Sequence, residues 1–221
     1  MGGAVAGEEA SRIAVETIHA QLSSPDGWQA QISDYSDIDP NELVDRLQQA
    51  ISGANETIVA RAAANPELKG MGTTVTLAFV HNTEVVIGHV GDSRAYLIDG
   101  SDGYCTQVTA DHTLVQALVD AGHISQEEAE SHPMKNVLYR ALGQSNDVDI
   151  DIYFERMHIG DRLILCSDGL TLHVEPEEIA QLAISHEPVE CSQKLIDLAK
   201  ERGGHDNISV AVIKVEKECA E

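Results

Sequence analysis

Apolar residues in the first third of the chain recur every three or four positions. This spacing predicts two helices, each with one buried face: one follows Gly7 and one begins at Asp39-Pro40 and ends before Asn65-Pro66. The stripe positions of the first are Ala10, Ile13, Ala14, Thr17, Ile18 and Leu22, and those of the second are Leu43, Leu47, Ile51, Ala54, Ile58 and Ala62. The segment 23–38 is rich in Ser, Asp, Gly and Pro and predicts a loop.

From Gly72 onward the pattern changes to short runs rich in β-branched residues. These runs predict strands at 73–80, 84–90 and 95–98, and a further strand end at 107–109. Turn residues follow the first and the third run, at His81-Asn82 and Asp99-Gly100, so we expect the runs to form an antiparallel meander. A helical patch at 113–121 follows, and Ser125 with Glu128 has the spacing of a capping box that opens a short helix.

The last third returns to strands and then alternates with helices. Apolar and polar residues alternate over 147–155, which predicts a strand with one buried face. That face would consist of Val148, Ile150, Ile152 and Phe154. The run 162–166 is almost continuously apolar and predicts a central strand, followed by helices at 176–185 and 188–202 and a strand at 208–215. The whole order is typical of an α+β fold in a single domain over 1–221.

The charge balance narrows the classes of partner. Of 221 residues, 37 are acidic and 14 are basic, which gives a net charge of −23 with neutral histidines. A chain of this charge repels nucleic acid and anionic membranes, so we expect neither as a partner. No apolar run approaches the roughly 18 residues of a membrane span, and residues 1–7 do not resemble a signal peptide. We therefore expect a cytoplasmic location. We also expect a monomer.

The four cysteines do not have the spacing of a metal or redox site. They are Cys105, Cys166, Cys191 and Cys219, with no C-x-x-C pair and no zinc-like spacing to histidine. We expect reduced thiols, with Cys166 in the core.

Three aspartates stand at the ends of predicted strands, beside a glycine or a turn. Asp92 follows Gly91, Asp168 precedes Gly169, and Asp206 comes just before the final strand. From such positions carboxylates can project into a shared cleft, and their mutual repulsion would be relieved by Mg²⁺ or Mn²⁺. Each aspartate alone is also typical of a turn in which it caps a backbone N–H, and spacing by itself favours that interpretation.

An ordered series of motifs adds a second line of evidence. In chain order the motifs are Gly72-Thr73-Thr74, Gly88-His89-Val90-Gly91-Asp92-Ser93-Arg94-Ala95-Tyr96, Thr109-Ala110-Asp111-His112-Thr113, Ser131-His132-Pro133, Arg140-Ala141-Leu142-Gly143, Gly160-Asp161-Arg162, Leu165-Cys166-Ser167-Asp168-Gly169-Leu170 and Gly204-His205-Asp206-Asn207-Ile208-Ser209. Together they resemble the type 2C, or PPM-type, metal-dependent Ser/Thr protein phosphatases of bacteria. The resemblance extends from Met1 to about Val215.

The resemblance implies a four-layer α-β-β-α sandwich of two antiparallel sheets flanked by helix pairs, with a Mn²⁺ or Mg²⁺ centre of two or three ions. Carried over by motif, Asp168 and Asp206 correspond to ligands of the two-metal centre, and Asp92 to a ligand of a third site that Asp168 shares. Residues 113–142 resemble a flap associated with substrate choice. Asp111 and His112 match a motif whose role stays open, and a helix cap by Asp111 is as good an explanation as a metal role.

The start of the chain departs from the family pattern. Members have two N-terminal strands that carry a phosphate-binding Arg, and then an Asp-Gly-x-Gly-Gly turn whose Asp bridges two metals. Met1-Gly2-Gly3 resembles the end of that turn, so we expect the fold to lack its first strands and the domain to be N-terminally incomplete. A chain without the bridging ligand should bind metal weakly and have little activity.

The implied reaction is hydrolysis of phosphoserine and phosphothreonine by a metal-activated water, with phosphorylated proteins, the products of a Ser/Thr kinase, as signalling partners. It needs no covalent nucleophile: we interpret Ser93 and Ser167 as turn residues and His89 as structural, and keep His112 and His132 as candidate proton donors. Two other functions stay open. One is a pseudophosphatase that binds phosphoproteins without turnover, and the other is a Ca²⁺-stabilised structural domain, which the acidity would suit but no EF-hand loop supports.

Overall fold

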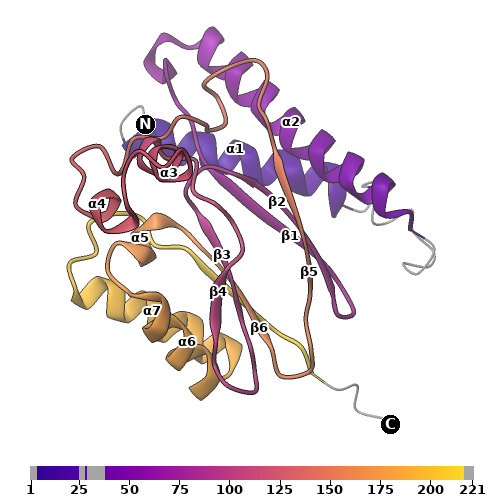
Figure 1. Ribbon diagram of the computed structural model, residues 1–221. Helices are drawn as coiled ribbons and strands as arrows, with labels where there is room; N and C mark the ends of the chain where they lie inside the picture. The colour runs from indigo at the N-terminus through magenta and orange to yellow at the C-terminus, as the bar shows by residue number, and fades with distance from the viewer. Residues whose placement is uncertain (1–3, 25–27, 29–37, 217–221) are drawn as a thin grey trace. The chain divides into compact units, whose positions relative to one another are not determined.

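The computed structural model describes residues 4–24, 28 and 38–216. Its helices and strands form a mixed α+β fold with two antiparallel sheets, which confirms the expected class (Figure 1). The expectations for Met1-Gly2-Gly3, for most of the 23–38 loop and for Cys219 fall outside the described residues. The chain divides into two compact units, Met1–Leu77 with Val86–Gly91 and His112–Ile152, and Ala78–Val85 with Asp92–Asp111 and Tyr153–Glu221.

The two predicted N-terminal helices are present and lie side by side in the first unit (Figure 1). They are α1 (Ala4–Leu22) and α2 (Pro40–Ala64). Helix α2 begins as predicted, because the side chain of Asp39 accepts a hydrogen bond from the N–H of Asn41 at 2.8 Å and proline occupies the first turn. Residues of the predicted stripes that are completely shielded from solvent are Ala10, Leu47, Ile51, Ala54 and Ile58. A short 3-10 helix, η3 (Pro66–Leu68), follows.

The strands after Gly72 do not form one meander. Strands β1 (Val75–His81) and β2 (Glu84–Val90) pair with each other, and β5 (Asp151–Arg156) completes a sheet in the order β1-β2-β5. The next strand, β3 (Arg94–Ile98), belongs to the other sheet. The chain leaves the first sheet at Gly91, whose φ of 119° is disfavoured for other residues and whose Cα lies so close to Thr74 that a Cβ would be 2.3 Å away.

The predicted strand over 147–155 starts later than expected and does not bury the predicted face. The buried side chain of Asn55 donates hydrogen bonds to the carbonyls of Ser145 and Asn146 at 2.9 and 3.0 Å, so this backbone is engaged before β5 begins at residue 151. Phe154 is 60% exposed instead of buried, whereas Ile150 and Ile152 lie beside Gly88.

A four-stranded antiparallel sheet in the order β4-β3-β6-β7 forms the frame of the second unit. Its other strands are β4 (Cys105–Gln107), β6 (Arg162–Cys166) and β7 (Val210–Lys214). The central position of β6 confirms the prediction from its apolar run. Arg94 lies opposite Cys166, and Cys166 lies opposite Val210.

Three helices of the second unit share an apolar core with this sheet. They are α5 (Asp168–Thr171), which the pattern did not predict, and the predicted helices α6 (Pro176–Ser185) and α7 (Pro188–Glu201). The core includes Tyr96, Ile98, Ile164, Cys166, Leu170, Val174, Ile179, Ala183, Cys191, Leu195 and Ala199. Cys166 is therefore a core residue, as expected.

The segment 113–142 of the first unit carries two short helices, α3 (Leu114–Asp120) and α4 (Gln126–Glu130). The predicted capping box is confirmed, because Ser125 and Glu128 exchange side chain to backbone hydrogen bonds of 3.2 and 2.8 Å. Thr113 and Leu138 pair as an isolated β-bridge, which joins the two ends of the segment. Across the described ranges, no helix combines the length and the apolar character that crossing a membrane requires.

Candidate active site

The three predicted aspartates leave the four-stranded sheet at the same end. Asp92 comes two residues before Arg94, Asp168 two residues after Cys166, and Asp206 four residues before Val210. Since β6 is antiparallel to both β3 and β7, the pairs Arg94 with Cys166 and Cys166 with Val210 place the start of β3, the end of β6 and the start of β7 together. The register therefore brings the three carboxyl-bearing segments to one edge.

The carboxyl groups at this edge interact electrostatically. Burial, followed by the charge of Asp168 and then that of Asp111, raises the pKa of Asp92 to about 6. Burial is also the main reason why the pKa of Asp168 is raised, and the charge of Asp206 adds to it. A raised carboxyl pKa means that the local environment disfavours negative charge there. The edge thus carries more acidic than basic groups.

A closed cage of ligands is absent from the part of the chain that the structure describes: no three His, Cys, Asp or Glu side chains lie close enough to hold one ion. The donor set nevertheless suits a hard cation. Mg²⁺ is commonly held by one or two carboxylates and keeps several waters, so an all-carboxylate edge with partly buried acids is compatible with it or with Mn²⁺. Asp92, Asp168 and Asp206 are the residues that would supply such ligands, one or two carboxylates to each ion.

Local contacts fix the segments that carry Asp168 and Asp206 against each other. The Ser167 hydroxyl donates to the carbonyl of Asn207 at 3.1 Å and accepts from the N–H of Ser209 at 3.0 Å. Gly169 permits this approach, because a Cβ at that position would lie 2.4 Å from the same carbonyl of Asn207. Ser167 was expected in a turn; it instead occupies the N-cap position of α5, directly after β6, and its hydroxyl joins two chain segments.

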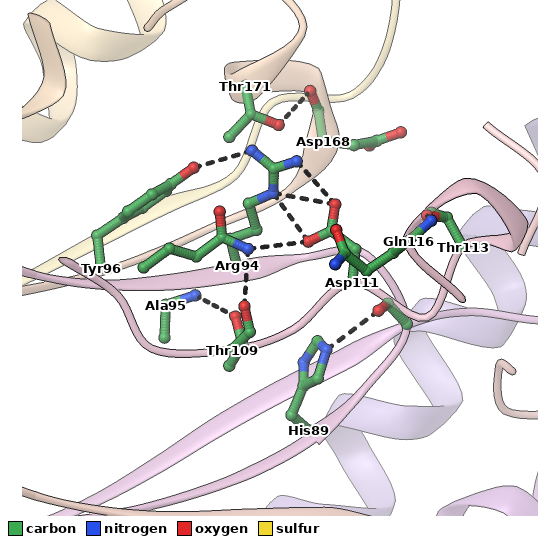
Figure 2. A network of polar contacts seen from close by, with 12 residues as sticks. His89, Arg94, Ala95, Tyr96, Thr109, Asp111, Thr113, Gln116, Asp168 and Thr171 are labelled. Carbon is green, nitrogen blue, oxygen red and sulfur yellow. Dashed lines mark hydrogen bonds and ion pairs between the residues drawn. The ribbon is translucent and has the colours of Figure 1, made fainter. Parts of the chain in front are cut away.

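An arginine–aspartate pair that the sequence did not predict lies at the same end of the sheet. Figure 2 shows the Arg94 guanidinium facing Asp111, with Nε 2.9 Å from Oδ1 and Nη2 2.7 Å from Oδ2. Its Nη1 donates to the Tyr96 hydroxyl at 3.0 Å. The helix-cap interpretation of Asp111 is wrong, because Thr113 is the N-cap of α3 and its hydroxyl accepts from the N–H of Gln116.

His112 forms part of a separate polar network in the first unit. Its ring is 2% exposed; Nδ1 accepts the N–H of Gly91 at 3.0 Å, and Nε2 lies 3.0 Å from Oδ2 of Asp151. Arg140 Nη1 donates to Oδ1 of the same carboxylate at 2.6 Å. Both ring nitrogens of His112 are therefore engaged in structural contacts, which argues against its role as a proton donor to substrate.

The other singled-out histidines also make local contacts. His89 is buried, with Nδ1 3.0 Å from the Thr76 hydroxyl and Nε2 3.0 Å from the carbonyl of Gly91, which supports the structural role expected for it. His132 accepts the N–H of Met134 through Nδ1 at 3.1 Å. Its role as a proton donor stays a prediction.

The described cysteines are poor nucleophiles. Burial raises the pKa of the Cys166 thiol to about 12 and those of Cys105 and Cys191 to about 11. A thiolate is the reactive form, so these thiols stay protonated and unreactive near neutral pH. Among the described residues, the carboxylate edge is therefore a better candidate for the active site than the cysteines.

Comparisons with known proteins agree with this arrangement. The family model for protein phosphatase 2C matches residues 1–198. The serine/threonine protein phosphatase PstP of Mycobacterium tuberculosis is 38% identical over 216 residues, which cover 97% of this chain and 39% of that protein. The serine/threonine phosphatase stp of Listeria innocua is 37% identical over 215 residues, which cover 97% of this chain and 81% of that protein. The chain thus spans well under half of the mycobacterial relative.

Solved structures match the fold as well. The crystal structure of M. tuberculosis PstP superposes with a TM-score of 0.83 at 37% identity, covering 98% of this chain and 86% of that one. The PstP catalytic domain in complex with two manganese ions superposes with a TM-score of 0.80 at 35% identity, covering 98% and 85%. On the strength of the family match, the relatives and the shared fold, this chain belongs to the protein phosphatase 2C family.

Proposed function

We propose that the chain hydrolyses phosphoserine and phosphothreonine in proteins, with divalent ions held by Asp92, Asp168 and Asp206. The observation that carries the proposal is the convergence of these three carboxyl-bearing segments at one end of the β3-β6-β7 sheet, with the pKa values of Asp92 and Asp168 raised. The names of the relatives and the two manganese ions in the PstP structure support the same assignment.

Hydrogen bonds within the chain would fix the positions of the proposed metal ligands. Asp168 and Asp206 stand on segments that Ser167 joins through hydrogen bonds to Asn207 and Ser209. Asp92 stands on the neighbouring strand end and interacts with Asp168 through charge. When bound, Mn²⁺ or Mg²⁺ would supply a water of lowered pKa and neutralise charge on the phosphoryl oxygens. The expected substrates are phosphorylated proteins.

The test is phosphate release from a phosphothreonine peptide, with and without Mn²⁺ and with a chelator. We expect release that requires the metal, falls by at least about 100-fold in Asp168→Asn, and is weaker on a phosphotyrosine peptide. Asp99→Asn is the matched control, because Asp99 is an exposed aspartate at the opposite end of β3, where its carboxylate accepts from Ser101. The rate of the unchanged chain is compared with that of Asp168→Asn. A slow rate therefore still supports the proposal if it exceeds the rate of this variant.

Two outcomes would reject the proposal. Phosphopeptide binding without any metal-dependent release would identify a phosphoprotein-binding module. Stabilisation by Ca²⁺ but not by Mn²⁺ or Mg²⁺, again without release, would identify a Ca²⁺-stabilised structural domain.

A further inference from the structure

Each of the three guanidinium nitrogens of Arg94 donates a hydrogen bond within the second unit. It makes a two-point ion pair with Asp111, at 2.9 and 2.7 Å, and its remaining nitrogen donates to the Tyr96 hydroxyl. Burial alone would lower the pKa of Arg94, but the hydrogen bond and charge of Asp111 outweigh burial and raise it. The pair is therefore a tight one, in the planar geometry that arginine and carboxylate favour.

Asp111 is itself held in place. Its carboxylate is 12% exposed, and Gln107 donates to it at 3.2 Å while also donating to the Thr109 carbonyl at 2.7 Å. The register of β3 with β4, in which Tyr96 lies opposite Gln107, brings residue 111 to the same sheet end as residue 92. The position of Asp111 is thus set by the hairpin.

Arg94 is also close to two of the proposed ligands in the sheet: Asp92 comes two residues before it, and Asp168 comes two residues after Cys166, which lies opposite Arg94. Its charge acts on Asp92, two residues away, and lowers the pKa of that carboxyl, while the charge of Asp111 acts on both Asp92 and Asp168 in the opposite direction. Removing one partner of a partly buried ion pair leaves an uncompensated charge, so we expect an Arg94 guanidinium without Asp111 to turn toward another carboxylate. Figure 2 shows Asp168 on the side of the guanidinium that faces away from the Ala95 backbone.

We propose that Asp111 is a positioning residue: it holds the Arg94 guanidinium away from Asp92 and Asp168 and so keeps those carboxylates available to a divalent cation. The inference rests on the proposed function of this carboxylate edge. Asp111 contacts neither substrate nor metal in this role and acts only through Arg94. It gives a physical reason for the presence of Asp111 in the motif Thr109-Ala110-Asp111-His112-Thr113.

The test measures Mn²⁺ binding from the electron paramagnetic resonance signal of free Mn²⁺, for the unchanged chain, Asp111→Asn, Arg94→Met and the double variant. Asp111→Asn releases Arg94 to pair with the ligands, so the Mn²⁺ Kd should rise about tenfold, the change expected when a new partly buried ion pair must be broken. Removing the arginine as well should restore the Kd to within about threefold of the unchanged chain. A second substitution that repairs the first is not expected of residues with a merely structural role.

A matched ion pair in the same unit provides the control. Lys214 Nζ lies 2.8 Å from Oε1 of Glu187. In the strand register Lys214 lies opposite Arg162, at the end of β6 that is far from Cys166. Glu187→Gln and the double variant with Lys214→Met should leave the Mn²⁺ Kd unchanged. Circular dichroism and thermal unfolding verify that every variant is folded.

The outcomes separate this inference from the proposed function. If the double variant binds Mn²⁺ no better than Asp111→Asn, or if Asp111→Asn binds as well as the unchanged chain, the positioning role is wrong. If the unchanged chain binds no Mn²⁺, or its binding survives Asp168→Asn, the proposed metal site is wrong and the inference is rejected together with it.

Discussion

Two partly buried aspartates, one in each unit, respond to their surroundings in opposite directions. Burial raises the pKa of Asp151, but hydrogen bonds from His112 and Arg140 outweigh burial and leave it below its ordinary value. Burial also raises the pKa of Asp92, and there the neighbouring charges of Asp168 and Asp111 add to the effect. The Asp151 network is balanced by a guanidinium and an imidazole, whereas the Asp92 edge contains an excess of carboxylates.

The difference indicates that the Asp151 network stabilises the fold, whereas the Asp92 edge is suited to binding a ligand. A balanced network stabilises the fold by satisfying every polar group that it buries. An unbalanced one costs stability, and a bound ligand can supply the missing charge; under the proposed function that ligand is a divalent cation. Substitutions at Asp151 and at the carboxylate edge should therefore change stability with opposite signs, and only the edge should respond to metal.

The largest effect should come from adding metal. At 100 times its Kd, Mn²⁺ should raise the free energy of unfolding by about 2.7 kcal/mol, since a ligand that binds only the folded state stabilises it. In Asp168→Asn this gain should vanish, whereas Asp151→Asn should keep it. Urea unfolding with Mn²⁺ or with a chelator measures both. An equal gain in Asp168→Asn would place the metal elsewhere.

The second-largest change in the free energy of unfolding should come from removing the Asp151 carboxylate. Asp151→Asn leaves Arg140 without its anionic partner and weakens the contact with His112, so the free energy of unfolding should fall by about 2 kcal/mol with or without metal. The control is Asp149→Asn at a neighbouring exposed position. Urea unfolding of the two variants should differ clearly, and equal stabilities would mean that the Asp151 network contributes nothing.

Removing the Asp92 carboxylate should change the free energy of unfolding in the opposite direction to Asp151→Asn and by a smaller amount. Without metal, Asp92→Asn removes a buried charge that Asp168 and Asp111 repel, so the free energy of unfolding should rise by about 1 kcal/mol. With Mn²⁺ the variant should gain less than the unchanged chain. A destabilised variant in the presence of chelator would show that Asp92 has a structural role that outweighs the repulsion.

The pH dependence should be the weakest of the four effects. Asp92 has a folded-state pKa of about 6, above the value of roughly 3.9 of an unfolded aspartate, so the folded state binds more protons between these two values. Without metal its contribution to stability is therefore present below about pH 4 and is lost as the pH rises to about 6. Between pH 5.5 and pH 7 we expect a loss of roughly 0.8 kcal/mol that is absent from Asp92→Asn.

Asp151 acts in the other direction. Its lowered pKa gives stability that is present above the unfolded value and is lost as the pH falls through the folded value, below the range in which Asp92 titrates. Chemical unfolding at several pH values, in the presence of chelator, separates the two. A profile of Asp92→Asn that runs parallel to that of the unchanged chain would contradict the assignment.

Local patterns predicted most elements because the same residues that give the pattern also make the stabilising contacts. Asp39 caps α2, Ser125 and Glu128 form the capping box, and the apolar run 162–166 is the central strand β6. The prediction was wrong where a distant residue decided the outcome. Asn55 engages the backbone before β5, and Gly91 turns the chain into a second sheet. Neither effect has a signature within a short window of sequence.

The site shows the same division. Asp92, Asp168 and Asp206 were identifiable as acids at strand ends and from the motifs, and the register places their segments together. The pairing of Arg94 with Asp111 was missed because both residues were interpreted singly. A signal exists in retrospect: once β3 and β4 are taken as a hairpin, Arg94 and Asp111 fall at its open end.

The strand register also has a kinetic consequence. The carboxyl-bearing segments come from distant parts of the chain, and they meet only after β6 has paired with both β3 and β7. Contacts of large sequence separation form slowly, because a long loop must close before they are made. Since β7 is the last of the four strands to leave the ribosome, nascent chains that lack β7 cannot yet hold the three carboxyl-bearing segments together at this sheet end.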